Sequence, residues 1–170
     1  MAPTFDDVTD QDIAVLAEQL GRPPRGVVGI AARCVCGRPL VVRTAPRLDD
    51  GTPFPTTYYL TCPHAVARID RLEAAGGVDR YERLLAEDAG LRASYDAASL
   101  RQRALRRPSA QMADGGASLA LGIAGVARPG AVKCLHAHAA FALAEPGYVL
   151  GMRILAEAEP LFPDGGCCCA

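Results

Sequence analysis

Hydrophobic and polar residues follow two different periods along this chain. Between residues 27 and 61 the apolar residues form short runs rich in valine and tyrosine, which is typical of β-strands. From His64 onward they recur at helical spacing, as Val66, Ile69 and Leu72 do. The pattern predicts strands over Val27–Arg33, Leu40–Thr44 and Thr57–Thr61, and helices over Thr9–Gly21, His64–Gly76, Val78–Glu87, Leu91–Arg107, Val132–Ala144 and Tyr148–Glu159.

Capping and turn residues separate these elements. Thr9 is a suitable N-cap for the first helix and Gly21 a suitable end. Asp50-Gly51 predicts a hairpin loop between the second and third strands, and residues 108–118, small and glycine-rich, predict another loop. We therefore expect one α+β domain over residues 1–160, a small antiparallel sheet of about three strands followed by helices, with a flexible Gly/Cys-rich tail over residues 161–170.

The composition is that of an ordinary globular domain with one unusual feature. The 170 residues carry a net charge of −1, and 50% of them are hydrophobic, which excludes a disordered chain and a globally basic nucleic-acid binder. The unusual feature is the presence of seven cysteines, together with three histidines. In a reducing compartment such residues indicate metal or redox chemistry more often than disulfides.

The sequence predicts a cytoplasmic protein that does not enter a membrane. Its N-terminal segment is acidic and lacks the basic start and apolar stretch of a signal peptide. The longest apolar run, Leu119–Ala127, has about half the length that a membrane-spanning helix needs.

The cysteines and histidines before the tail fall into three clusters: Cys34 with Cys36, Cys62 with His64, and Cys134 with His136 and His138. If the second and third strands form a hairpin, the first two clusters meet at one end of the sheet. The third cluster opens a predicted helix, where Cys134 and His138 share a face and His136 joins Cys134 if the first turn is irregular.

Together these clusters supply the four thiolate or imidazole ligands that a tetrahedral zinc ion takes. We predict a zinc site that joins the sheet to the helices, formed by Cys34, Cys62, Cys134 and His136, with Cys36, His64 and His138 as alternates. The competing interpretation is that these are small buried cysteines and hydrogen-bonded core histidines. Neither an H-E-x-x-H nor an H-x-E…C-x-x-C pattern is present, so no catalytic residue is assigned. Cys167, Cys168 and Cys169 in the tail either add a thiolate ligand to a metal, act as a redox or metal-capturing segment, or have no role.

Charge is distributed unevenly along the first 47 residues. Residues 22–47 contain six arginines and no acid, whereas the first 20 residues contain five acids and no base. Because arginine binds phosphate and carboxylate through paired hydrogen bonds, the basic stretch predicts a surface for an anionic ligand or a protein partner, with nucleic acid less favoured; the candidates are Arg33, Arg38, Arg43 and Arg47. Alternatively, the acidic N-terminal helix covers the basic sheet and forms intramolecular ion pairs.

Two long motifs carry a family resemblance. Residues 33–63, which begin Arg-Cys-Val-Cys-Gly-Arg-Pro-Leu and end Tyr-Tyr-Leu-Thr-Cys-Pro, and residues 128–138, Arg-Pro-Gly-Ala-Val-Lys-Cys-Leu-His-Ala-His, resemble the actinobacterial domain-of-unknown-function family numbered five hundred and one. The resemblance runs from about residue 10 to residue 144. It implies an actinobacterial cytoplasmic protein encoded near exopolyphosphatase-like and septum-formation initiator genes, and it implies no established activity. In the family pattern the positions of Cys36 and His138 also hold non-ligand residues, and that of Cys62 also holds histidine, which favours the first ligand set over the alternates.

Three functions are consistent with these features. The first is a non-enzymatic domain with a structural zinc site and an arginine-rich surface for an anionic or protein partner. The second is a metal-dependent hydrolase acting on phosphate esters or polyphosphate, which the arginines and the implied gene neighbourhood favour. The third is a thiol redox sensor, which requires accessible thiols of low pKa.

Overall fold

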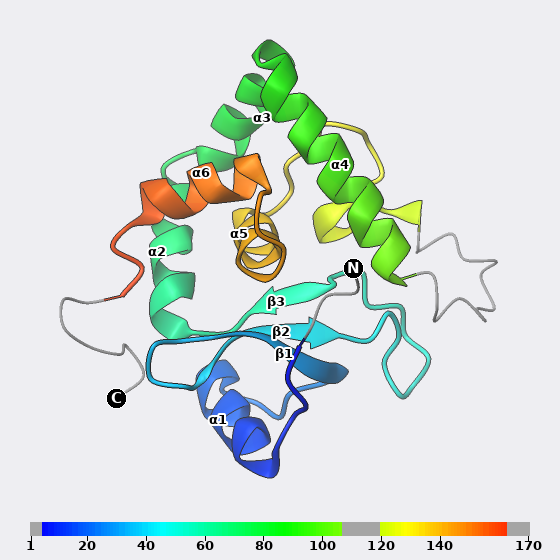
Figure 1. Cartoon of the computed structure of the whole chain (residues 1–170), viewed down its shortest axis with the longest axis vertical. Helices are drawn as coiled ribbons and strands as arrows, with labels where there is room; N and C mark the ends of the chain where they lie inside the picture. Colours follow the sequence, from blue (N-terminus) through cyan, green and yellow to red (C-terminus); the bar gives the residue numbers. More distant parts are fainter. Residues whose placement is uncertain (1–4, 107–119, 163–170) are drawn as a thin grey trace.

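A three-stranded antiparallel sheet separates the structure into two unequal layers (Figure 1). The computed structural model describes residues 5–106 and 120–162; the loop expected over 108–118 and the cysteine tail lie outside them. The strands are β1 (Val27–Arg33), β2 (Pro39–Thr44) and β3 (Tyr58–Leu60), in the order β1-β2-β3. The predicted α+β class and the three antiparallel strands are confirmed.

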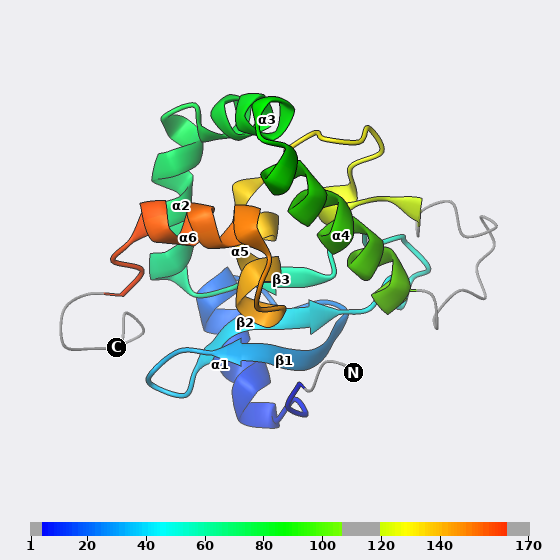
Figure 2. The same cartoon turned by 45° about the horizontal axis from the view of Figure 1, so that its top comes forward.

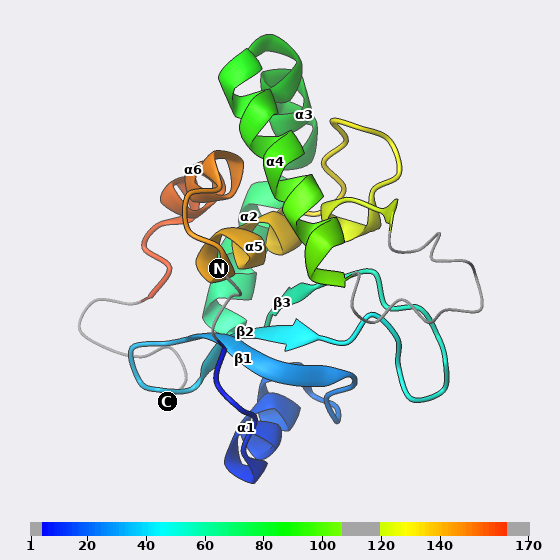
Figure 3. The same ribbon diagram turned by 45° about the vertical axis from the view of Figure 1, so that its right-hand side comes forward.

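The helices lie on both faces of this sheet. One helix, α1 (Asp10–Leu20), lies against one face, and the others gather on the opposite face, an arrangement that Figures 2 and 3 show from two further directions. Those on the larger side are α2 (Pro63–Ala74), α3 (Gly77–Glu87), α4 (Ala89–Arg106), the short 3₁₀ helix η3 (Ile123–Gly125), α5 (Leu135–Ala144) and α6 (Val149–Ala158).

Successive side chains of β2 alternate between the two faces of the sheet, so each layer has its own hydrophobic core. Val41 belongs to the large cluster beneath the helices, whereas its neighbour Val42 packs with Leu16 of α1 and Ile30 of β1 on the other face. Successive side chains of a strand point to opposite faces, so a continuous apolar run is what a sheet covered on both sides requires.

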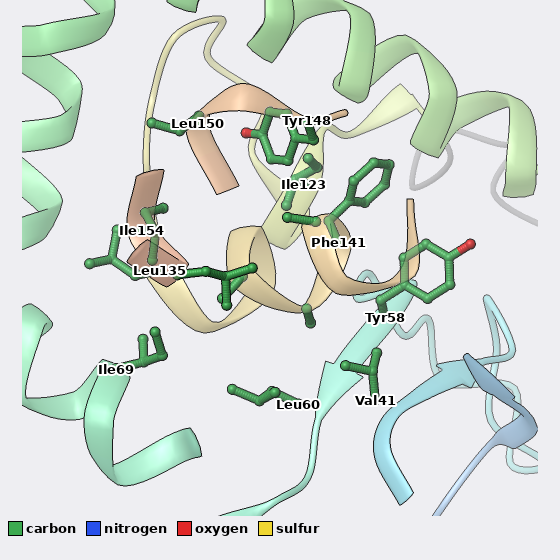
Figure 4. Close-up of a cluster of buried hydrophobic side chains, with 14 of the residues drawn as sticks. Val41, Tyr58, Leu60, Ile69, Ile123, Leu135, Phe141, Tyr148, Leu150 and Ile154 are labelled. Atoms are coloured by element: carbon green, nitrogen blue, oxygen red, sulfur yellow. The ribbon is translucent and has the colours of Figure 1, made fainter. Parts of the chain in front are cut away.

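Helix α5 occupies the centre of the large layer. It is apolar on all sides, as expected of a helix surrounded by other elements, and most of its residues are buried. Phe141 packs edge-to-face on Tyr58 of β3 with ring centroids 5.5 Å apart (Figure 4). Gly151 lets α6 lie close to α5, because a Cβ at this position would stand 2.5 Å from the His138 carbonyl oxygen.

The start of α5 differs from the sequence prediction. The helix predicted from Val132 begins at Leu135, and Cys134 is its N-cap with an extended backbone (φ −155°, ψ 117°). The physical reason is that the Leu135 N–H donates to Glu73 Oε1 at 2.6 Å, as the first N–H of a helix does to a capping carboxylate, while the Val132 N–H donates to Glu82 Oε1 at 2.7 Å. Cys134 and His138 therefore do not share a helical face.

Acidic residues of the N-terminal segment pair with β1. The Arg33 guanidinium donates to Asp12 Oδ1 at 2.7 Å and to Asp6 Oδ2 at 2.9 Å. Asp12 also completes a reciprocal capping box with Thr9 at the start of α1. The hydrogen bond from Arg33 holds the pKa of the Asp12 carboxyl well below its ordinary value of 3.8, against the opposing effect of burial.

We predict that Asp12→Asn lowers the free energy of unfolding by about 1–3 kcal/mol at neutral pH, because a charge-assisted hydrogen bond and a helix cap are both lost. A carboxyl whose pKa is lower in the folded state stabilises the fold above its unfolded pKa and loses that contribution as the pH falls. The stability difference between wild type and variant should therefore shrink below about pH 4 in urea unfolding. Asp10→Asn, exposed in the same helical turn, is the control; a difference that stays constant down to pH 2 would contradict the prediction.

Candidate metal centre

Three side chains of different chemistry meet where α5 begins. Cys134 is the N-cap of α5, His136 is its second residue, and Glu73 lies in the last turn of α2. One ligand atom from each of the three lies within 4.8 Å of the other two. Within residues 5–106 and 120–162 this is the group of metal-binding side chains that the fold assembles, and it joins two helices.

The imidazole of His136 is the central member of this group. Its Nδ1 lies 3.7 Å from Cys134 Sγ and 3.2 Å from Glu73 Oε1. On the other side of the ring, Nε2 lies 3.2 Å from Asp70 Oδ1 and 3.3 Å from the Val66 carbonyl oxygen. Sulfur, nitrogen and oxygen donors thus surround one point beside the helix end.

The same carboxylate caps the helix. Glu73 Oε1 accepts a hydrogen bond of 2.6 Å from the backbone N–H of Leu135, the first residue of α5. This N–H has no partner within its own helix, and the positive end of the helix dipole attracts the negative charge. Burial lowers the pKa of His136, but hydrogen bonds and charge from Cys134 and Glu73 outweigh burial and raise that pKa to about 9.

A cavity of about 260 Å³ lies beside Cys134 and His136. The rest of its lining comes from strand β3 and the preceding loop, and from α2 and α5, and consists of Thr56, Tyr58, Tyr59, Leu60, Val66 and Ala137. A ligand in this largely apolar cavity would contact both the thiol and the imidazole.

The structure brings together two of the four residues of the predicted ligand set. Cys134 and His136 are adjacent, through the irregular helix start that the sequence left open. Cys34 lies in the turn between β1 and β2, and Cys62 is the buried N-cap of α2. The bond from the Thr61 N–H to the Leu40 carbonyl oxygen places both at the same end of the sheet, but neither belongs to the group around His136.

The three alternates have different positions. Cys36 lies at the exposed tip of the β1–β2 turn, and His64 lies in the first turn of α2. His138 is fully buried, and its Nδ1 lies 2.7 Å from the Tyr148 hydroxyl oxygen. Burial lowers the pKa of His138 to about 3, so this ring is a neutral core histidine.

The four candidate anion-binding arginines all have partners within the chain. Arg33 pairs with acids of the N-terminal segment, and Arg38 lies 3.7 Å from Glu18 Oε2 of α1. Arg43 lies over the Phe5 ring and donates to the Leu105 carbonyl oxygen, and Arg47 donates to the Gly51 carbonyl oxygen. For Arg33 and Arg38 these contacts support the interpretation in which the acidic segment covers the basic sheet.

Glu73 is the member of the group that sequence reasoning missed. A signal for it existed: Val66, Asp70 and Glu73 are spaced four and three residues apart, so they share one face of α2. That face turns toward His136. Two acids on the same face as Val66 indicate a polar partner on the facing element.

The fold and this group define an α+β domain with a candidate metal centre between two helices. The family described as "protein of unknown function (DUF501)" has a sequence model that matches residues 30–155, so the chain belongs to this family. The matched segment contains Glu73, Cys134 and His136 and confirms the resemblance seen in the two motifs. No curated protein and no solved structure matches the chain.

Within the described parts of the chain, no single helix has both the length and the apolar character to cross a membrane. Taken together, α5 and α6 meet that requirement by length and composition, but they are bent by 108° relative to each other.

We predict that Tyr148→Phe lowers the free energy of unfolding by about 1–3 kcal/mol, because the buried His138 ring loses the hydroxyl that faces its Nδ1. The measurement is chemical denaturation followed by circular dichroism. Tyr59→Phe, at a partly exposed tyrosine, is the control and should change stability little. Unchanged stability of the Tyr148 variant would show that this hydrogen bond is not needed in the core.

Proposed function

We propose that this protein is a zinc-binding domain whose metal is held by Glu73, Cys134 and His136. Support comes from the convergence of a thiol, an imidazole and a carboxylate within 4.8 Å. These are the three ligand types that zinc takes in proteins. The Glu73 carboxylate and the Cys134 thiolate would compensate the charge of a divalent cation.

The adjoining cavity favours an accessible metal over a closed structural one. Structural zinc sites have four protein ligands, whereas catalytic sites have three and keep one position for water or substrate. When bound, zinc would supply Lewis-acid activation of a group held in the cavity. We therefore propose metal-assisted hydrolysis as the reaction class, with Cys134 and His136 forming one wall of the substrate cavity.

The lining of this cavity favours a small substrate with an apolar body over polyphosphate. Thr56 and His136 are polar, but Leu60, Val66 and Ala137 contribute apolar surface, and the lining contains no arginine from residues 5–106 or 120–162. We do not extend the proposal to a partner surface on the four arginines, since each has contacts within the chain. We assign this chemistry to the cytoplasm, where thiols stay reduced.

We predict that protein purified under reducing conditions holds about one equivalent of zinc, and that Glu73→Gln, Cys134→Ser and His136→Ala each weaken zinc binding by about 100-fold or more. The measurements are elemental analysis and competition with a chromophoric chelator. His64→Ala is the matched control, and Cys34→Ser and Cys62→Ser compare the two ligand sets. Zinc content below about a tenth of an equivalent would overturn the proposal, as would loss of zinc in the Cys34 and Cys62 variants but not in Glu73→Gln.

Cobalt substitution tests the open position. The Co(II) protein should show thiolate-to-metal absorption that is lost in Cys134→Ser, and added acetohydroxamate should shift its visible bands. A spectrum that no added ligand changes would show a closed structural site.

A second candidate function is a reactive thiol, which one specific geometry favours. Cys134 Sγ faces Nδ1 of His136 at 3.7 Å, while Nε2 of the same ring faces Asp70 Oδ1 at 3.2 Å. A cysteine beside a protonated histidine, itself oriented by a third group, is an arrangement that activates the thiol, and the raised pKa of His136 agrees with it. Cys134 also lies at a helix N-terminus, a position at which reactive cysteines occur.

We predict that, in metal-free protein, iodoacetamide alkylates Cys134 at least about tenfold faster than the buried Cys62, and that His136→Ala removes most of this advantage. Rates are read by peptide mass spectrometry. Asp70→Asn should slow the reaction less, because Asp70 only orients the ring. Equal rates at Cys134 and Cys62 would exclude a reactive thiol, and protection of Cys134 by added zinc would connect both functions to one site.

A further inference from the structure

A second cavity lies on the opposite side of the sheet from the main core. It has a volume of about 360 Å³ and begins where α1 ends, so it occupies the part of the outer face that the helix leaves uncovered. Its lining comes from the end of α1, the connection between α1 and β1, the three strands and the loop between β2 and β3: Leu20, Arg22, Pro24, Arg25, Val27, Val42, Thr44, Leu48, Phe54 and Tyr59.

The loop that covers this cavity is fastened at its base. The Ala45 N–H donates to the Gly26 carbonyl oxygen at 2.7 Å, and Arg25 forms an ion pair with Asp50 at 2.6 Å. Gly26 has a φ of +66°, and a Cβ there would stand 2.8 Å from Leu48 Cδ2, so the wall of the cavity packs tightly against this glycine. These contacts hold the loop between β2 and β3 beside the cavity.

Charge at the mouth of the cavity differs from that of its floor. Val27, Val42 and Tyr59 of the sheet make the floor apolar, whereas Arg22 and Arg25 are the charged residues of the lining and both are exposed. Arg25 is already paired with Asp50. Among the residues that the structure describes, Arg22 forms no hydrogen bond or ion pair, and no acid lines the cavity.

We propose that this cavity binds a small amphipathic organic anion, whose apolar body lies on the sheet floor and whose carboxylate or phosphate head is held by Arg22. Small-molecule sites are concave, largely apolar and directed by a few polar groups, and this volume falls in their lower range of about 300–1,000 Å³. Arginine supplies the two parallel donors that a carboxylate or phosphate accepts. The site is separate from the candidate metal centre; of the described residues, Tyr59 alone lines both this cavity and the one beside the metal centre.

The chain contains no tryptophan, which makes a selective fluorescence experiment available. Tyr59→Trp places one indole in the floor of the cavity. Octanoate, octyl phosphate and 1-octanol, none of which fluoresces, are titrated against this variant. We expect saturable fluorescence changes with the two anions and binding at least about fivefold weaker for octanol, because only the anions engage Arg22. The relative affinities of octanoate and octyl phosphate identify the preferred head group.

Arg22→Ala in the same background should weaken octanoate binding about five- to tenfold, whereas Arg83→Ala, at an exposed arginine of α3, should leave it unchanged. Calorimetry with octanoate on the unmodified chain keeps the test independent of the tryptophan variant. Equal binding of octanol and octanoate, or an unchanged affinity in Arg22→Ala, would overturn the proposal, as would the absence of saturable heat with the unmodified chain. Adding or removing zinc should not alter these affinities. The test of this cavity therefore stays valid even if the proposed zinc site is wrong.

Discussion

The hydrogen bond between the Glu73 carboxylate and the backbone N–H of Leu135 is the contact on which the site depends. Helix α5 is buried in the centre of the fold, and a buried helix end cannot leave its N–H groups to water. A carboxylate from α2 satisfies the first of them and brings its charge to the positive end of the helix. Oε1 of this carboxylate lies 3.2 Å from His136 Nδ1. The side chain that caps the buried helix is therefore also a member of the candidate metal group.

The extended conformation of Cys134 follows from the same constraint. Because the helix starts at Leu135, the side chain of the N-cap residue turns alongside the first helical turn and meets His136 two residues later. Had the helix begun at Val132, Cys134 would have lain on the same helical face as His138, away from His136. In the structure His138 lies in the core and contacts Tyr148, while Cys134 meets His136. The helix start thus decides which histidine Cys134 contacts.

Sequence reasoning predicted the fold well because it depends on local signals. Thr9, Gly21 and the valine-rich runs act on their immediate neighbours, and the ends of α1, β1 and β3 agree with prediction to within one residue. The metal group was predicted in part, since Cys134 and His136 are close in the chain. Glu73 was missed because its spacing with Val66 and Asp70 shows that they share a face of α2 but does not show which element faces them. That Cys34 and Cys62 are metal ligands stays a prediction, because it depends on tertiary distances that strand order alone does not determine.

The family match covers the candidate metal centre completely and the outer cavity only in part. Residues 30–155 include every member of the Glu73, Cys134 and His136 group, together with both helices that hold it. The outer cavity takes Leu20, Arg22, Arg25 and Val27 from the segment before residue 30. The family match therefore covers the whole of the candidate metal centre. It does not cover Arg22 and Arg25, the charged residues at the mouth of the outer cavity, because both precede residue 30.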